Sequence, residues 1–175
     1  MSDITSHLSY LLEEGLKSRI IIEFGTRGGS STSAFLLALS ELDNPQGKLI
    51  SVDIDGACGE RIVRRFGPLT NSWTFFHGSS QDQGIVNEIT KWAPLDLVFI
   101  DSSHEASQTT QELEIYAPLL KIGGKFILHD TDPNNVYWVL GVRTPMMDFL
   151  KLHPNFSIER DVTFSHGMTT VIKNA

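Results

Sequence analysis

The chain has 175 residues, 41% of them hydrophobic and 20% charged, which suits one well-buried domain over residues 1–175 and is short for two. Its 21 acidic residues exceed its 14 basic ones, and a formal net charge of -7 repels a phosphate backbone, so we expect no nucleic-acid partner. Cys58 is the only cysteine, no apolar run approaches the roughly 18 residues of a membrane span, and the start has no secretory pattern, so we expect a cytoplasmic protein without a disulfide or a membrane partner.

The first 130 residues alternate short apolar runs with amphipathic segments. Leucines at helical spacing predict a helix over residues 8–16. The runs that predict strands cover residues 19–24, 48–53, 73–77, 96–101 and 125–130, the last one directly after a turn at Gly123 and Gly124. Helices are expected between them from Ser30 or Ser31 to about 43–47, and over 60–66, 85–92 and 107–116. This alternation is typical of a parallel sheet with helices on both faces.

The last part of the chain departs from this alternation. An apolar helix around residues 146–150 is followed by predicted strands at 156–160 and 168–173, with a turn near residues 165–167. Strands so close together pair as an antiparallel hairpin. The predicted fold class is therefore α/β, a doubly wound and mostly parallel sheet of Rossmann-like type with an antiparallel C-terminal hairpin.

The predicted parallel strands all end in polar or acidic residues, which are Glu23, Asp53, His77, Asp101 and the pair His129 and Asp130. The carboxyl ends of parallel strands meet at one edge of a sheet, and ligands of open α/β sheets bind there. We therefore expect these side chains to line one crevice.

A glycine-rich turn over residues 25–29 follows the first of these strands. Glycines allow backbone N–H groups to approach a ligand closely. The negative charge of Glu23 beside the turn disfavours a pyrophosphate and suits a cationic ligand, such as the amino-acid end of S-adenosylmethionine. The alternative is that Glu23 pairs with Arg27 and that the glycines only close a tight turn between strand and helix.

Asp53 ends the second strand, where an acid can accept both ribose hydroxyls of a nucleoside. Its neighbour Asp55 can take that role or simply face solvent. The polar turn at residues 78–82 follows the third strand, and its short side chains and free N–H groups can read an adenine edge. Alone, this turn is equally typical of an ordinary helix cap.

In combination these segments resemble the class I S-adenosylmethionine-dependent methyltransferases, in the branch of small O-methyltransferases that includes catechol-type and cephalosporin-hydroxylase-like proteins. The segments that carry the resemblance are Glu23 to Ser30, Ser51 to Asp55, Gly78 to Asp82, Phe99 to Glu105, Leu119 to Thr131, Gly141 to Arg143 and His166 to Met168. Together they extend over about residues 20 to 173, so the resemblance implies a methyltransferase domain over most of the chain.

The resemblance also implies how the cofactor is bound. Glu23 and the turn would hold its methionine part and Asp53 its ribose. Ser80 and Gln81 would lie beside its adenine, with Asp101 near the transferred methyl group. The residues implied in cofactor binding are Glu23, Gly25, Thr26, Gly28, Gly29, Ser30, Asp53, Ile54, Ser79, Ser80, Gln81 and Asp101.

In metal-dependent relatives, an acid after the fourth strand and a polar pair after the fifth hold magnesium, and Asp101, His129 and Asp130 occupy those places here. Carboxylates suit Mg²⁺, whereas a histidine fits Mn²⁺, iron or zinc better. The candidate catalytic residues are Asp101, His104 and His129. His104 lies three residues after Asp101 and has an intrinsic pKa suited to a general base; alternatively it caps a helix, and His129 binds a backbone carbonyl.

The leading hypothesis is an enzyme that transfers a methyl group from S-adenosylmethionine to a hydroxyl oxygen of a small-molecule acceptor, assisted by a divalent cation such as Mg²⁺ or Mn²⁺. One alternative is an NAD(P)-dependent oxidoreductase, which shares the glycine turn and the acid after the second strand. Another is a non-catalytic cofactor-binding protein of the same fold. We also expect a homodimer, with the N-terminal helix or the late hairpin as its contact.

Overall fold

The computed structural model describes residues 3–41 and 47–175, and within these ranges seven strands form one sheet in the order β3-β2-β1-β4-β5-β7-β6. The strands are β1 (Ile20–Phe24), β2 (Lys48–Asp53), β3 (Trp73–His77), β4 (Leu95–Ile100), β5 (Leu120–His129), β6 (Phe156–Val162) and β7 (Met168–Lys173). The pairs among β1 to β5 are parallel, and β7 lies antiparallel between β5 and β6. The predicted α/β fold class with its C-terminal hairpin is confirmed.

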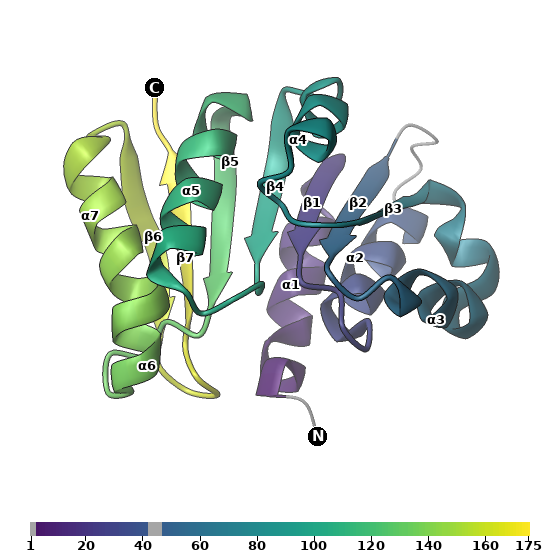
Figure 1. Ribbon diagram of the computed structural model, residues 1–175, viewed down its shortest axis with the longest axis horizontal. Helices are drawn as coiled ribbons and strands as arrows, with labels where there is room; N and C mark the ends of the chain where they lie inside the picture. Colours follow the sequence, from purple (N-terminus) through teal and green to yellow (C-terminus); the bar gives the residue numbers. More distant parts are fainter. Residues whose placement is uncertain (1–2, 42–46) are drawn as a thin grey trace.

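Helices cover both faces of this sheet (Figure 1). The α-helices are α1 (Leu8–Gly15), α2 (Ser30–Glu41), α3 (Ala57–Phe66), α4 (Gln83–Thr90), α5 (Ala106–Tyr116), α6 (Val136–Trp138) and α7 (Thr144–Leu152). Short 3-10 segments cover Asp3–His7, Gly67–Ser72 and Ala117–Leu119, and a π-helical turn covers Val139–Arg143. None of the helices in the described ranges combines the length and the apolarity needed to cross a bilayer.

Two apolar cores lie on the opposite faces of the sheet. In β1, Ile22 and Phe24 join the core made with α4, α5 and α7, whereas Ile21 joins the core made with α1, α2 and α3. This follows from the two-residue period of a strand. Glu23 therefore shares the face of Ile21 and points towards α2, not into the apolar core under α5.

The predicted turn at Gly123 and Gly124 is wrong, because β5 begins earlier and runs through both residues. The register shows the reason: Leu95 pairs with Leu120, but Leu97 pairs with Lys125. The extra residues form a bulge, and Gly123 takes a φ of +76° there, which glycine adopts without steric cost. The predicted end of the helix before β2, at 43–47, falls mostly on 42–46, outside the described residues.

The carboxyl ends of β1 to β5 gather at the lower edge of the sheet in Figure 1. The backbone turns sharply at two of them. Gly25 after β1 has a φ of +90°, and Asp130 after β5 has a φ of +58°, a conformation that costs a non-glycine residue free energy. Sharp turns of this kind occur where a side chain or an amide must be aimed at a particular place.

Candidate active site

The glycine turn after β1 packs against the chain that leaves β4. The Asp101 N–H donates to the Phe24 carbonyl oxygen at 2.9 Å, and a Cβ atom at Gly25 would lie 1.9 Å from the Asp101 carbonyl oxygen. Only glycine fits so close an approach with a positive φ. The turn therefore holds the start of the Asp101 segment beside the end of β1.

Asp53 fixes the same turn from β2. Its Oδ2 accepts the backbone N–H groups of Thr26 and Arg27, both at 2.8 Å, and its Oδ1 accepts that of Asp55 at 2.8 Å. The carboxylate thus occupies two of the turn's amides, which a diphosphate would otherwise need. This arrangement places negative charge at the turn and favours a ligand with hydroxyl or ammonium donors over a dinucleotide.

Glu23 is fully buried and does not reach a cavity. Its two oxygens accept hydrogen bonds from Ser31 at 2.6 Å, from Thr32 at 3.0 and 2.9 Å, and from Ser51 at 2.5 Å. Burial raises the pKa of this carboxyl group to about 7, although the hydroxyl donors oppose the rise. A direct contact between Glu23 and a ligand does not fit this geometry; the carboxyl group instead ties β1 to the start of α2 and to β2. The alternative ion pair with Arg27 is also absent from the described contacts of Glu23.

Two cavities open at the carboxyl edge of the sheet. One has a volume of about 310 Å³ and is lined by Phe24, Gly25, Arg27, Val52, Asp53, Ile54, Gly78, Ser79, Ser80, Asp101, Ser102, Ser103 and Gln108. The other, of about 180 Å³, is lined by Ile4, Gly25, Thr26, Arg27, Gly28, Ser30, Ser31 and Asp101. Gly25, Arg27 and Asp101 border both, so the two cavities lie on either side of the end of β4 and share part of their walls.

Three of the predicted cofactor residues, Glu23, Gly29 and Gln81, line neither cavity. Gly29 instead allows close packing, because a Cβ atom there would lie 2.2 Å from Ile62 Cδ1. Sequence reasoning missed Gln108, which lines the larger cavity. The sequence did indicate its place, because Gln108 lies in the first turn of a helix that starts beside the predicted crevice.

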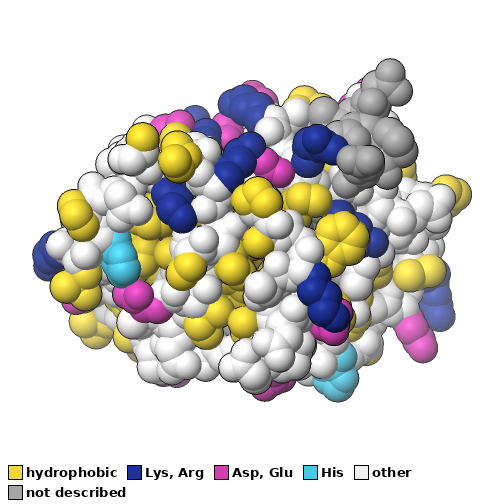
Figure 2. Space-filling view, turned by 90° about the horizontal axis from the view of Figure 1, so that it is seen from above, with side chains coloured by type: hydrophobic (Ala, Val, Ile, Leu, Met, Phe, Trp, Pro, Cys, Tyr) yellow, Lys and Arg dark blue, Asp and Glu magenta, His cyan; other side chains and the backbone are white. Residues whose placement is uncertain are grey.

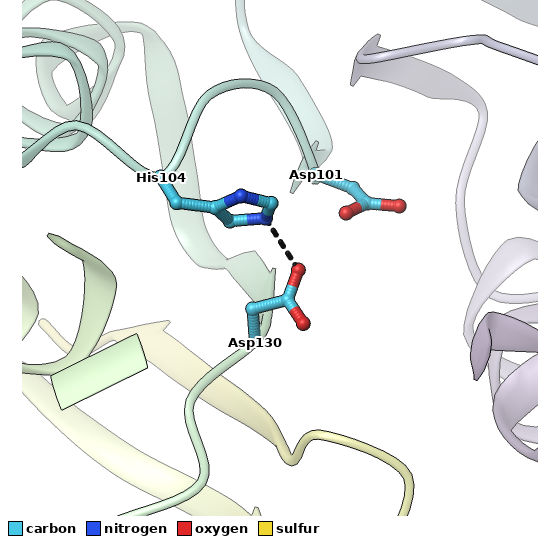
Figure 3. A group of neighbouring side chains, drawn as sticks. All are labelled: Asp101, His104 and Asp130. Carbon is cyan, nitrogen blue, oxygen red and sulfur yellow. Dashed lines mark hydrogen bonds and ion pairs between the residues drawn. The ribbon is translucent and has the colours of Figure 1, made fainter. Parts of the chain in front are cut away.

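A cluster of two carboxyl groups and histidines lies next to Asp101. His104 Nε2 is 2.6 Å from Asp130 Oδ2, and one ligand atom from each of Asp101, His104 and Asp130 lies within 4.8 Å of the others. Figure 3 shows the three side chains pointing into one space from the ends of β4 and β5. The hydrogen bond with Asp130 raises the pKa of His104, against the effect of its burial.

His129 completes the cluster from the last position of β5. Its Nδ1 lies 3.2 Å from Asp130 Oδ2 and 3.4 Å from Asp101 Oδ1, and its Nε2 lies 3.2 Å from the Ser165 carbonyl oxygen. Burial opposes the charged imidazole, but the two carboxylates outweigh it and raise the pKa of His129 to about 10. Both readings of His129 are therefore realised: it binds a backbone carbonyl with one nitrogen and faces the carboxylates with the other.

The turn between β6 and β7 and the segment after β5 enclose this cluster. His166 Nδ1 lies 3.3 Å from Asp130 Oδ1. The Trp138 ring is 4.5 Å from the ring of His104 and 5.3 Å from that of His166, measured between centroids. Trp138 thus forms an aromatic wall beside the cluster.

The donor set of the cluster fits a divalent cation. Asp101 and Asp130 supply carboxylate oxygens, which Mg²⁺ and Mn²⁺ prefer. Asp130 Oδ1 and His129 Nδ1 are buried and accept or donate no hydrogen bond with good geometry in the described structure, and buried polar atoms of this kind call for a partner. The compact group contains His104 in addition to the predicted set of Asp101, His129 and Asp130.

A cavity larger than these two lies at the opposite, amino edge of the sheet. It has a volume of about 750 Å³ and is lined by Arg19, Ile20, Gly47, Lys48, Asn71, Ser72, Trp92, Pro94, Asp96 and Lys121. Figure 2 looks onto this edge, where basic side chains surround apolar ones. Asp96 is already engaged there, with an ion pair to Lys121 and with the amides of Arg19 and Ile20. Size alone does not make it the site of chemistry, because ligands of such folds bind at the carboxyl edge.

Residues 2–174 match a family model described as rhamnosyl O-methyltransferase/CmcI. Among curated proteins, the rhamnosyl O-methyltransferase of Mycobacterium tuberculosis is 26% identical over 138 residues, which cover 77% of this chain and 54% of that protein. The rhamnosyl O-methyltransferase of Mycobacterium leprae is also 26% identical over 138 residues, covering 77% and 57%. The chain thus spans little more than half the length of these relatives.

Two solved structures show the same fold at low sequence identity. The O-methyltransferase TomG from Streptomyces achromogenes, in complex with S-adenosylmethionine, superposes with a TM-score of 0.73 at 19% identity, covering 97% of this chain and 80% of that one. An O-methyltransferase from Bacillus cereus, in complex with S-adenosylhomocysteine, gives a TM-score of 0.76 at 18% identity, covering 96% and 81%. The seven-stranded sheet is therefore the Rossmann-like sheet of these proteins.

Proposed function

The chain belongs to the rhamnosyl O-methyltransferase/CmcI family, and from this premise we propose that it transfers a methyl group from S-adenosylmethionine to a hydroxyl oxygen of a small molecule. The observation that carries the proposal is the position of Asp101. It lines both cavities at the carboxyl edge and belongs to the cluster with His104 and Asp130. A cofactor in the cavities would thus meet an acceptor at the cluster.

In this proposal the larger cavity takes the nucleoside. Asp53 accepts the ribose hydroxyls, and Ile54, which is 79% exposed and lines the cavity, packs on the base. Ser79, Ser80 and Gln81 lie at the base edge. The methionine part follows the smaller cavity along Gly25, Thr26, Gly28 and Ser30, with Glu23 and Gly29 behind the turn as supports for its shape.

For methyl transfer the protein has only to align the acceptor oxygen with the methyl group and to remove the hydroxyl proton. The acceptor oxygen attacks the methyl carbon with a lone pair, the carbon–sulfur bond breaks, and sulfur keeps that electron pair. The hydroxyl proton passes to His104, whose Nε2 hydrogen bond with Asp130 leaves Nδ1 as the accepting atom. Asp130 then stabilises the imidazolium, and Trp138 and the surrounding chain exclude water.

A divalent cation fits beside these groups, and Asp101 and Asp130 would hold it, with His129 as a nitrogen ligand. Such an ion lowers the pKa of a bound hydroxyl and fixes its direction. His129 is suited to this position because its Nε2 contact with the Ser165 carbonyl directs Nδ1 towards the carboxylates.

The name of the curated relatives makes a sugar hydroxyl the first acceptor class to test. The test uses S-adenosylmethionine with a labelled methyl group, a panel of glycosides and phenols, and reactions with and without Mg²⁺ or Mn²⁺. Transfer of label to an acceptor oxygen supports the proposal. Thermal stabilisation by NAD but not by S-adenosylhomocysteine would instead support an oxidoreductase, a reading that the carboxylates of Asp53 and Asp101 at the turn disfavour.

Tight cofactor binding without transfer to any acceptor would favour a non-catalytic protein of the same fold. We further propose a cytoplasmic homodimer. The exposure of Phe164, 51% at the turn of the late hairpin, supports a contact there. Sedimentation that shows only a monomer at working concentration would reject the dimer, and cell fractionation tests the location.

A further inference from the structure

Glu112 on α5 is a buried acid that the proposed chemistry does not use. Its exposed fraction is 0%. Its Oε1 accepts hydrogen bonds from Ser80 Oγ at 2.6 Å and from Gln108 Nε2 at 3.0 Å, and its Oε2 accepts one from Ser102 Oγ at 2.9 Å. These three partners line the larger cavity, whereas Glu112 does not. Glu112 thus lies directly behind the cavity wall.

Glu112 determines which way the Gln108 amide faces. Gln108 Nε2 donates one hydrogen to Ser80 Oγ at 2.7 Å and the other to Glu112 Oε1 at 3.0 Å. In the reversed orientation, the Gln108 oxygen would face a carboxylate oxygen at this distance, and two acceptors would be left without a hydrogen between them. The amide is therefore held with its nitrogen towards Glu112 and its oxygen away from it.

The orientation of Gln108 determines that of Gln81 in turn. Gln108 Oε1 lies 2.6 Å from Gln81 Nε2. Because Gln108 offers an oxygen, Gln81 must offer its NH₂ group, and its own Oε1 is the amide atom that no described residue binds. Gln81 thus presents a hydrogen-bond acceptor next to Gln108, which itself lines the larger cavity together with Ser80.

We propose that Glu112 is a positioning residue that selects the base of the cofactor, by fixing the amides of Gln108 and Gln81 so that an acceptor faces the base edge. The proposal rests on the proposed function, because the base is the adenine of S-adenosylmethionine. The exocyclic amino group of adenine donates to the Gln81 oxygen. Hypoxanthine carries a carbonyl oxygen at the same position, so two acceptors meet and binding is weakened.

Calorimetry with S-adenosylhomocysteine and its deaminated analogue, S-inosylhomocysteine, tests this selection. The wild type binds the adenine compound more tightly by roughly ten- to hundred-fold, the effect of leaving one buried acceptor unpaired. In Glu112→Gln the new amide offers either an oxygen or an NH₂ group, so Gln108 and Gln81 can both turn over. The ratio of the two affinities then falls towards one, mainly because the analogue binds better.

The matched control is Thr110→Ala, on the same helix, where the side chain is exposed and its hydroxyl donates only to the Ala106 carbonyl; it keeps the wild-type ratio. If Glu112→Gln does not fold, Gln108→Met removes the same link at similar volume and must lower the ratio as well. In a Gln81→Leu background, Glu112→Gln changes the ratio no further.

The two possible failures are distinguishable. If the wild type binds S-adenosylhomocysteine and folded Glu112→Gln keeps the full ratio, the role of Glu112 is refuted while the proposed function stands. If the wild type binds neither compound, the proposed function fails and this inference fails with it.

Discussion

His104 Nε2 lies 2.6 Å from Asp130 Oδ2, and this contact joins the segment after β4 to the end of β5. The hydrogen bond raises the pKa of His104, because the carboxylate stabilises the imidazolium. The Asp130 carboxyl group is also close to His129, and although burial opposes its ionised form, the two histidines hold its pKa well below the usual range. Asp130 is thus the anion around which the cluster is built.

The first prediction concerns proton transfer. Replacing His104 by Gln removes the proton acceptor but keeps a polar side chain of similar length. We expect kcat for methyl transfer to fall by roughly 10²- to 10⁴-fold with no change in the affinity for S-adenosylhomocysteine, which binds away from this side chain. Initial rates and calorimetry on the same preparation measure both quantities. A variant with the wild-type rate would remove His104 from the mechanism.

The second prediction concerns the cation. We expect the wild type to bind Mn²⁺, observed by paramagnetic resonance, and Asp130→Asn to bind it at least about ten-fold more weakly, because one anionic ligand is lost. Asp148→Asn, on the exposed part of α7, serves as a control of the same charge change. Equal Mn²⁺ affinity in all three proteins would refute the assignment of the cluster as a metal site.

The third prediction concerns the ribose. Asp53→Ala should weaken binding of S-adenosylhomocysteine by about 1–3 kcal/mol, the usual scale for a lost hydrogen bond to a charged group. It should also lower the melting temperature, since the Thr26 and Arg27 amides lose their acceptor. Asp55→Ala changes an exposed neighbour that does not line the cavity and should leave the affinity unchanged. Unaltered calorimetry for Asp53→Ala would contradict the ribose assignment.

The fourth prediction concerns a glycine outside the cavities. A Cβ atom at Gly141 would lie 1.9 Å from the His104 carbonyl oxygen, so Gly141→Ala must displace the segment that carries His104. We expect methyl transfer to fall by roughly 100-fold, the effect of about 1 Å of misplacement, with S-adenosylhomocysteine affinity retained. Gly84→Ala, where a Cβ atom meets nothing within 4 Å, is the control. Full activity in Gly141→Ala would show that the position of this segment does not matter.

The fifth prediction concerns pH and Glu23. The pKa of this group rises from an ordinary value of 4.5 to about 7 on folding, chiefly through burial. The folded protein therefore binds the proton more tightly than the unfolded chain, and this contribution to stability is present below pH 4.5 and is lost as the pH rises through 7. In urea unfolding, the free energy of unfolding of the wild type should fall by up to roughly 3 kcal/mol between pH 4.5 and 8. Glu23→Gln should not show this fall. The same dependence of the free energy of unfolding on pH in both proteins would contradict the raised pKa of Glu23.

The sequence alone was sufficient to predict most helices and strands, and to predict the edge of the sheet at which the polar residues meet. Lys48–Asp53, Trp73–His77 and Met168–Lys173 are strands with the predicted bounds, because short runs rich in apolar and β-branched residues between polar turns leave few alternatives. The convergence of Asp53, Asp101 and Asp130 on one edge follows from parallel pairing alone.

The orientation of individual side chains could not be predicted in the same way. Glu23 was expected to face a ligand, but hydroxyl groups from α2 and β2 surround it, and no local pattern reveals that these segments meet there. His166 reaches Asp130 from the distant turn between β6 and β7, and no local pattern predicts the positive φ of Asp130. The burial of Glu112 could not be predicted from the sequence, since an acid in a helix is most often exposed.

A crystal structure with S-adenosylhomocysteine tests the proposed function most directly. The ribose hydroxyls should lie on the Asp53 carboxylate, the adenine beside Ser80 and Gln81, and the sulfur atom next to Asp101. The product bound elsewhere, for instance among Arg19, Lys48 and Trp92 at the amino edge, with no density between Asp53 and Asp101, would contradict it.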